Sequence, residues 1–252
     1  MEEKYKLTHT GSEVDSGVAR ALSGGAIDQS MSAKLDWEGL INPEFTIAQA
    51  GIGGNHGSVP YAADCWKLVS GTVSAAPGGG LVLNGTIRQT LETAVGFDAV
   101  ASINVTSGTA TAAYGDATKQ FNITSSGGTI KRAHLGLTAI ADWAKIPPAD
   151  YGEELRKCQR YCMAYGQYTI WPAIDVHPDY IDFCITTPRN MRATPVVANQ
   201  SNLVVSGNAG FSFSVIGNTG NAPRIRASKD SHGLSGNLVV ECAGIVLLGA
   251  DL

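Results

Sequence analysis

Alternation of apolar and polar residues is the sequence feature that most restricts how this chain can fold. Apolar side chains occupy every second position in several short runs, with Ser, Asn, Thr or His between them. A period of two places one set of side chains on each face of a strand, which is typical of half-buried antiparallel sheets. The clearest runs are Ala101, Ile103 and Val105; Phe121 and Ile123; and Ala133, Leu135 and Leu137.

Turn residues separate these runs at the spacing of hairpins. Gly108, Gly115 and the cluster Ser125–Gly128 fall between the alternating runs. Asn84-Gly85 stands between Leu81-Val-Leu and Thr86-Ile-Arg and predicts a two-residue hairpin turn, because both residues accept the positive φ that such a turn needs. We therefore expect residues 40–146 to form an antiparallel β-sandwich of jelly-roll type.

Residues 150–166 carry helical rather than strand spacing. Their apolar side chains recur at i, i+3, i+7 and i+10, at Leu155, Cys158, Cys162 and Tyr165. Asp150 and Glu153 make a start that resembles a capping box, and Gly166 provides a stop. The pattern predicts a helix that joins the sandwich to a second, smaller β domain. Residues 147–252 would then contain this helix and the C-terminal β domain.

The C-terminal domain is predicted from weaker strand signals. Runs at 168–171 and 181–185 and the alternation of Phe211, Phe213 and Val215 favour strands. Residues 237–248 are the longest apolar run, which is too short for a bilayer span and predicts a buried final strand or strand pair.

Residues 1–39 form a separate N-terminal segment. A capping box at Thr10–Glu13 precedes a short helix whose face carries Val14, Val18 and Leu22. A helix of about three turns is marginal alone. We expect its apolar face to be covered by the rest of the chain, by a copy of itself, or by another protein.

Composition excludes several classes of function. A net charge of −4 gives no basic footprint for nucleic acid. The chain lacks the run of about 20 apolar residues that a membrane span needs, and its N-terminus lacks the apolar stretch of a secretory signal. Five scattered cysteines argue for buried free thiols rather than a disulfide framework.

Candidate chemical sites are few, and each has a simpler structural interpretation. His177 with Asp175 and Asp179 has the residue types of a metal or acid–base site, but a polar turn is the favoured interpretation. Cys158 and Cys162 lie one helical turn apart without a second Cys/His pair nearby, which favours packing. The glycine loops lack the Lys-Ser/Thr of a nucleotide site, and no nucleophile elbow is present. We expect no catalytic residue, no metal and no cofactor.

Aromatic residues offer a second kind of site. Tyr165, Tyr168 and Trp171 follow the predicted helix closely, and an aromatic face complements the CH-rich face of a sugar ring. The same three residues could instead belong to the core, and both interpretations stay open.

Five motifs, in their order along the chain, resemble a family of bacteriophage fibre proteins that form tail, neck or head fibres. They are Asn42-Pro-Glu-Phe-Thr-Ile-Ala-Gln-Ala-Gly, Tyr61-Ala-Ala-Asp-Cys-Trp, Asp150-Tyr-Gly-Glu-Glu-Leu-Arg-Lys-Cys-Gln-Arg-Tyr, Met191-Arg-Ala-Thr-Pro-Val-Val and Gly249-Ala-Asp-Leu. The resemblance covers about residues 40–252. The chain departs from the family at Cys65 and Cys162, where members often carry Arg and Tyr.

The resemblance implies a non-enzymatic virion component, usually a homotrimer, assembled in the host cytoplasm. Its N-terminal segment, whose Leu7–Asp15 is similar to the start of short phage appendage proteins, would attach it to other virion proteins. Its β domains would face a glycan or protein of the host surface. Two alternatives are a phage-borne polysaccharide depolymerase and a decoration protein of the capsid or neck without receptor binding.

Overall fold

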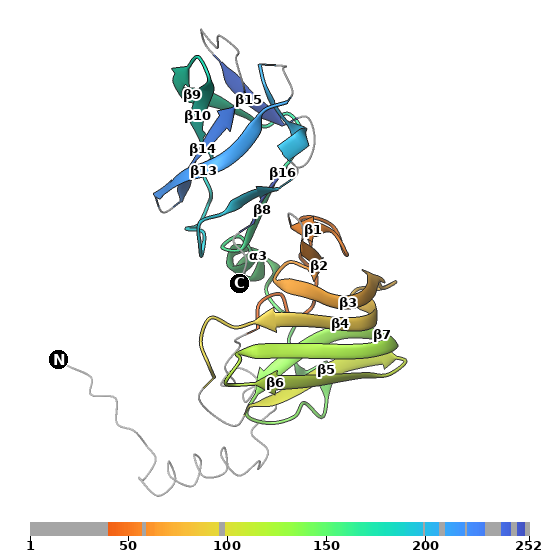
Figure 1. The fold of residues 1–252 in the computed structure, drawn as a ribbon. Helices are drawn as coiled ribbons and strands as arrows, with labels where there is room; N and C mark the ends of the chain where they lie inside the picture. The colour runs from red at the N-terminus through yellow and green to blue at the C-terminus, as the bar shows by residue number, and fades with distance from the viewer. Residues whose placement is uncertain are drawn as a thin grey trace, which may run out of the picture.

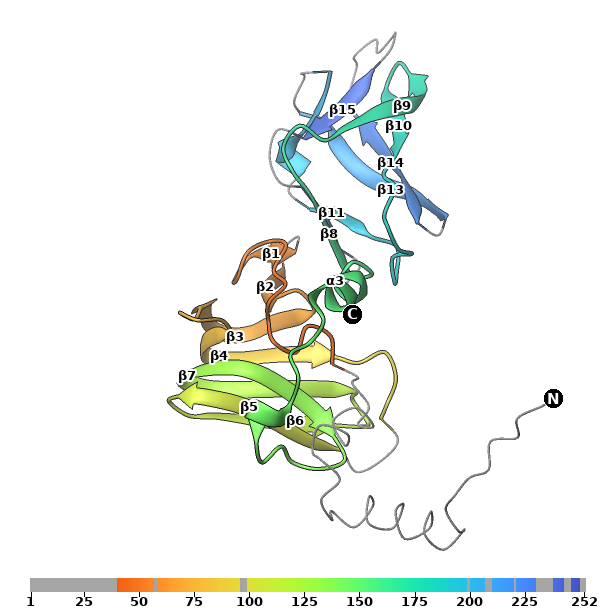
Figure 2. The same cartoon turned by 180° about the vertical axis from the view of Figure 1, so that it is seen from behind.

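The structure of the chain is a computed structural model that describes residues 40–56, 59–95, 99–198, 200–206, 210–219, 221–229, 238–242 and 246–249. The expected mainly-β class is confirmed by two sandwich-like β domains, with a short helix between them in both views (Figure 1, Figure 2). The N-terminal segment 1–39, with the predicted helix and the side chains Val14, Val18 and Leu22, lies outside the described residues. Within the described ranges, no helix has the length and apolar character to cross a bilayer.

The first domain is built on one antiparallel sheet. Its strands are β1 (Asn55–His56), β2 (Val59–Ala63), β3 (Trp66–Ala75), β4 (Leu81–Thr90), β5 (Val100–Ser107), β6 (Ala110–Gly115) and β7 (Gln120–Gly136). The order is β1-β2-β3-β4-β7-β5, with β6 also paired to β7. Strands β1 to β4 are successive neighbours. β4 then pairs with β7, and the chain between them supplies β5 and β6, which both pair with β7.

β7 is one continuous strand of 17 residues, although its sequence predicts two strands separated by Ser125–Gly128. The glycines form a bulge inside the strand instead, since Gly127 has φ +108° and the register with β4 shifts opposite it, between Leu83 and Asn84. A bulge adds a residue and bends the strand without ending its ladder. β7 can therefore pair with β6 over its first part and with β5 over its last part, along the same edge.

The hairpin turn predicted at Asn84-Gly85 is wrong, because β4 runs straight through both residues. Gly85 faces Gly71 of β3, and a Cβ added to Gly71 would lie 1.9 Å from the Asn84 carbonyl oxygen. The two glycines thus allow β3 and β4 to approach closely. The turn between these strands is made by Gly78–Gly80, all with positive φ.

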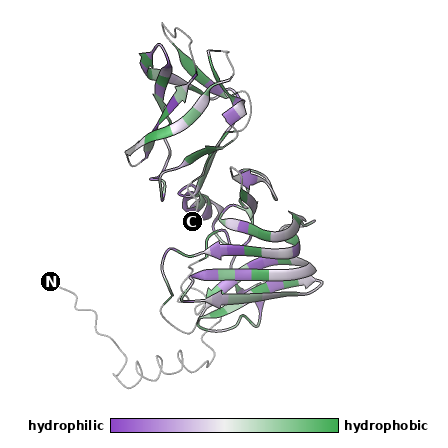
Figure 3. Ribbon diagram, in the orientation of Figure 1, coloured by the Kyte–Doolittle hydropathy of each residue, from purple (hydrophilic) through white to green (hydrophobic). Residues whose placement is uncertain are grey.

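The core of the first domain lies on one face of the sheet, and hydropathy alternates along its strands (Figure 3). Trp66 is fully buried, with its ring 5.0 Å from Phe45 and 5.8 Å from Phe121. Its indole N–H donates to the carbonyl oxygens of Ile41 and Asn42, so the buried donor is satisfied. The segment before β1 is thereby fixed over the sheet.

The second domain contains two antiparallel sheets. The larger has the order β12-β15-β9-β10-β14-β13, and the smaller has the order β11-β16-β8. Their bounds are β8 Cys162–Tyr165, β9 Ile170–His177, β10 Tyr180–Cys184, β11 Val196–Ala198, β12 Leu203–Val205, β13 Ser212–Thr219, β14 Ala222–Ser228, β15 Val239–Cys242 and β16 Val246–Gly249. The run predicted to hold a buried final strand or strand pair contains β15 and β16, which belong to different sheets and do not pair with each other.

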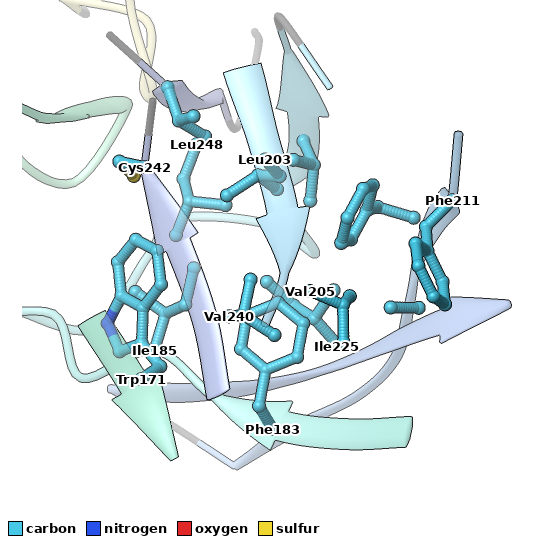
Figure 4. Packing of buried hydrophobic residues seen from close by; sticks show 14 of the residues in the cluster. Trp171, Phe183, Ile185, Leu203, Val205, Phe211, Ile225, Val240, Cys242 and Leu248 are labelled. Carbon is cyan, nitrogen blue, oxygen red and sulfur yellow. The ribbon is translucent and has the colours of Figure 1, made fainter. Parts of the chain in front are cut away.

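Apolar side chains from both sheets of the second domain share one core. Phe183 and Ile225 of the larger sheet and Leu248 of the smaller one are fully buried in it (Figure 4). Burial of a large apolar side chain contributes about 1.5–3 kcal/mol. This two-layer packing therefore stabilises a domain whose individual strands are short.

The predicted helix 150–166 is correct at its start and too long at its end. α3 spans Tyr151–Cys158, and the Asp150 carboxylate caps it by accepting the Glu153 backbone N–H at 2.8 Å. Residues 162–165 are strand β8, which pairs with β16. Met163 packs in the second core while Cys162 is buried on the other side, which is alternation with a period of two. The apolar positions of this stretch fit both helical spacing and a period of two. Residues 162–165 form a strand because they pair with β16.

Both parts of this stretch contact the first domain. Leu155 and Cys158 of α3 pack with Ile47 and Cys65, and Glu154 accepts the Asn42 backbone N–H at 2.6 Å. Two further contacts join the Gln49 side chain to the Cys162 carbonyl oxygen and to the Ala164 backbone N–H, and Gln49 is itself held by the Asp64 carboxylate. The expected joint between the two β regions is therefore a helix packed on the first domain, followed directly by a strand of the second.

Candidate ligand-binding site

The three aromatic residues predicted to bind a ligand do not form one exposed platform. Trp171 is only 8% exposed and lies in the second core beside Ile185 (Figure 4). Tyr165 packs edge-on against Trp171 with ring centroids 5.2 Å apart, and its hydroxyl donates to the Thr186 carbonyl oxygen. Burial raises the pKa of Tyr165 to about 12. Both rings therefore fill the core, which was the other interpretation of their sequence.

Tyr168 alone of the three is open to solvent, with 80% of its surface exposed. Its positive φ of +69° belongs to the tight turn before β9, and its backbone N–H donates to the Cys242 carbonyl oxygen. A single exposed ring can touch a ligand, but by itself it gives neither enclosure nor directional hydrogen bonds.

An open cavity of about 330 Å³ in the first domain combines an aromatic ring with polar side chains. It lies between the β3–β4 turn, the β5–β7 ladder and the segment that leads from β7 to α3. Its lining residues are Glu44, Thr46, Gly78, Gly79, Gly80, Asn104, Lys131, Arg132, Trp143, Ile146 and Pro148. We call this the Trp143 cavity. Its volume is near the lower end of the range of about 300–1,000 Å³ found for small-molecule sites.

Arg132 is the fixed polar centre of the Trp143 cavity. Its Nη1 donates to the Pro147 carbonyl oxygen at 2.6 Å and lies 3.3 Å from the Glu44 carboxylate. Glu44 also accepts the Ala149 backbone N–H at 3.1 Å. The Arg132 side chain is 11% exposed, and its Nε is buried without a hydrogen-bond partner among the described residues. An unmet buried donor costs about 1–3 kcal/mol.

Trp143 enters the cavity wall through a short 3₁₀-helix, η1 (Trp143–Lys145). Asp142 caps this turn by accepting the Ala144 backbone N–H at 3.1 Å. The Trp143 ring is half-buried, so part of it stays open to solvent. Across the β5–β7 ladder, Asn104 faces Arg132 directly, which brings an amide beside the guanidinium.

This combination suits a carbohydrate. Sugar hydroxyls are both donors and acceptors, and amide, carboxylate and guanidinium groups can bind them in pairs. The ring of Trp143 complements the CH-rich face of a sugar. Sequence reasoning missed Trp143 because it stands alone between Asp142 and Ala144, outside any aromatic cluster. The useful signal was its place in a Pro-containing connector beside the polar positions of β5 and β7.

The polar group Asp175, His177 and Asp179 lies on the exposed β9–β10 hairpin. His177 stacks on Tyr180 with ring centroids 4.6 Å apart, and its Nδ1 lies 3.6 Å from the Asp179 carboxylate. Among the described residues no three His, Cys, Asp or Glu side chains are placed to share a metal ion.

Asp182 is the most buried carboxylate of this region, with 0% exposure. It accepts hydrogen bonds from Arg226 at 2.8 and 2.9 Å and from Arg224 at 2.7 Å. These guanidiniums, Arg226 above all, hold the pKa of Asp182 below its usual range. A carboxylate that is paired in this way is suited to holding β10 against β14 rather than to accepting a proton from a substrate.

All five cysteines, expected to be buried free thiols, are free; four are buried, and Cys184 is half-buried. Cys158 of α3 packs with Cys65, and Cys162 of β8 is buried beside Ala198. Burial, together with the neighbouring Cys158 thiol, raises the pKa of Cys65. A protonated, enclosed thiol is a poor nucleophile.

No family model, no curated protein and no solved structure matches the chain.

Proposed function

We propose that the chain is a virion fibre protein of a bacteriophage that binds a host-surface glycan through the Trp143 cavity. The observation that carries the proposal is the meeting of a half-open Trp143 ring with Asn104, Glu44 and a fixed Arg132 in one cavity. Its setting in a phage fibre rests on the resemblance of the motifs between residues 42 and 252. The N-terminal segment 1–39 would attach the protein to the virion, and the assembly would be a homotrimer.

The fold of the first domain supports a binding role. The cavity is lined by strands and by a capped turn, and rigid supports of this kind hold contact residues in place. A charged fraction of 16% leaves a polar, weakly charged surface, which favours hydrogen bonding over electrostatic attraction. We assign no reaction to the site.

Binding of the full chain to polysaccharide extracted from susceptible host cells tests the proposal, with measurement of reducing ends in the same tubes. We expect saturable binding without a rise in reducing ends. New reducing ends would identify a depolymerase. Absence of binding to both polysaccharide and whole cells would leave a decoration role and overturn the proposal.

Light scattering of the purified full chain tests the assembly. We expect a mass of three chains at micromolar concentration. A mass of one chain under the same conditions would contradict the homotrimer.

A further inference from the structure

A second cavity, with a different chemistry, lies where the end of α3 meets the second domain. It has a volume of about 350 Å³ and is lined by Arg160, Pro188, Arg189, Asn190 and Asn221. Its side chains comprise two guanidiniums, two amides and a proline, with no carboxylate. We call it the arginine cavity.

The charge around the arginine cavity is positive. Arg160 lies 3.1 Å from the Glu92 carboxylate, and Arg192 shares the same carboxylate at 3.7 Å. Tyr161 donates its hydroxyl to this oxygen as well, at 2.6 Å. One oxygen of the Glu92 carboxylate is therefore shared by three groups, and its single negative charge offsets only one of the positive charges of Arg160, Arg189 and Arg192. The Arg189 side chain has no hydrogen-bond or ion-pair partner among the described residues.

The wall of the arginine cavity is held in place by a buried threonine. Thr187 is 0% exposed, and its hydroxyl lies 2.6 Å from the Arg189 carbonyl oxygen and 3.1 Å from that of Asn221. Its backbone N–H donates to the Asn221 carbonyl oxygen at 2.8 Å. On the other side, the Arg192 backbone N–H donates to the Arg160 carbonyl oxygen at 2.8 Å. The backbone of both Arg160 and Arg189 is therefore fixed by hydrogen bonds, which lowers the conformational entropy lost when a ligand binds.

We propose that the arginine cavity binds an anionic group, a carboxylate or a phosphate, on a small polar molecule such as an acidic sugar. Guanidinium donors match the oxygens of both groups in a two-point geometry. The side-chain amides of Asn190 and Asn221 can both donate and accept, which suits the hydroxyls next to such an anion. The cavity is larger than a bare ion requires. The proposal does not depend on the Trp143 cavity.

Isothermal titration calorimetry of the full chain with glucuronate, glycerol phosphate and glucose tests the proposal. We expect glucuronate, glycerol phosphate or both to bind with a Kd of roughly 1 mM. This binding should weaken as the salt concentration rises. Glucose should not bind at this cavity. The stronger of the two anions identifies the source of the charge, a sugar acid or a phosphate ester. A wild-type chain that binds neither anion overturns the proposal.

Substitutions at Arg189 locate the binding. Arg189→Ala should weaken anion binding about tenfold or more, because hydrogen bonds to a charged group contribute about 1.5–3 kcal/mol. Arg189→Lys keeps the charge but loses the two-point geometry, so its affinity for the anion should lie between those of wild type and Arg189→Ala. Arg156→Ala is the matched control, since Arg156 is an exposed arginine of α3 paired with Glu153. Equal affinity in wild type and Arg189→Ala, with circular dichroism showing both folded, would place the anion elsewhere and refute the assignment.

Discussion

Single residues in this protein set which strands can lie side by side. Gly71 and Gly85 face each other on β3 and β4, and neither has room for a side chain, because an added Cβ would meet carbonyl oxygen at 1.9 and 2.1 Å. In the second domain, Asp182 of β10 holds β14 beside it by binding Arg224 and Arg226. Each of these residues therefore determines how closely one pair of strands can be held together.

Gly71→Ala should lower the free energy of unfolding of the first domain by about 3–4 kcal/mol, because the methyl group collides with backbone that cannot move without breaking the ladder. Gly78→Ala is the matched control, since Gly78 has the similar φ of +80° but no atom within 4 Å of an added Cβ. It should cost only about 1–2 kcal/mol, the cost of a left-handed conformation. Urea titration of both variants measures the difference. Equal losses would show that β3 and β4 can separate locally.

Asp182→Asn should lower the free energy of unfolding of the second domain by about 2–3 kcal/mol at pH 7, through the loss of charge-assisted hydrogen bonds. The folded-state pKa of Asp182 lies below its unfolded value of about 3.9. Its stabilisation is therefore present above that unfolded value and is lost as pH falls through the folded-state pKa. Thermal unfolding between pH 2 and 7 should show that the variant loses less stability than wild type as the pH falls. If wild type and variant lose the same stability on acidification, that loss belongs to other carboxylates.

At the scale of elements, the sequence predicts the type of most segments and fails where two periods coincide. Cys158, Cys162 and Tyr165 fit a helix, yet residues 162–165 also alternate as a strand, and only the partner strand β16 decides between the two. Gly127 ends no strand, because the ladder with β4 continues past the bulge. Such outcomes depend on residues far away in the chain, which local spacing does not contain.

Helix α3 gives a prediction at this scale. Leu155 packs with Ile47 and Cys65, so Leu155→Asp should destabilise the first domain by about 1–3 kcal/mol, since it places a charge against an apolar cluster. Hydrogen exchange read by mass spectrometry should show faster exchange in β3, β4 and β7, with β10 and β14 unchanged. Arg156→Ala, on the exposed side of α3, is the control. Faster exchange in both domains would mean that α3 supports the second domain equally.

At the scale of the whole molecule, two β domains carry two cavities of different chemistry. The mainly-β class and the order of the domains follow from alternation, turn residues and the apolar stretch after Pro148. The candidate site could not be predicted in the same way. The Trp143 cavity brings together Glu44, Asn104, Arg132 and Trp143 from four separate segments. The register of β5 against β7 aligns two of them, and no spacing along the chain encodes that register.

The most direct test of the glycan-binding account is the affinity of full-length Trp143→Ala and Trp143→Phe for the host polysaccharide, measured against wild type. We expect Trp143→Ala to weaken binding about tenfold or more and Trp143→Phe to retain part of it, because a smaller ring still stacks on a sugar. Circular dichroism should show both variants folded, since Trp143 is half-buried and lies outside the main core. Wild-type affinity in a folded Trp143→Ala variant would contradict the account.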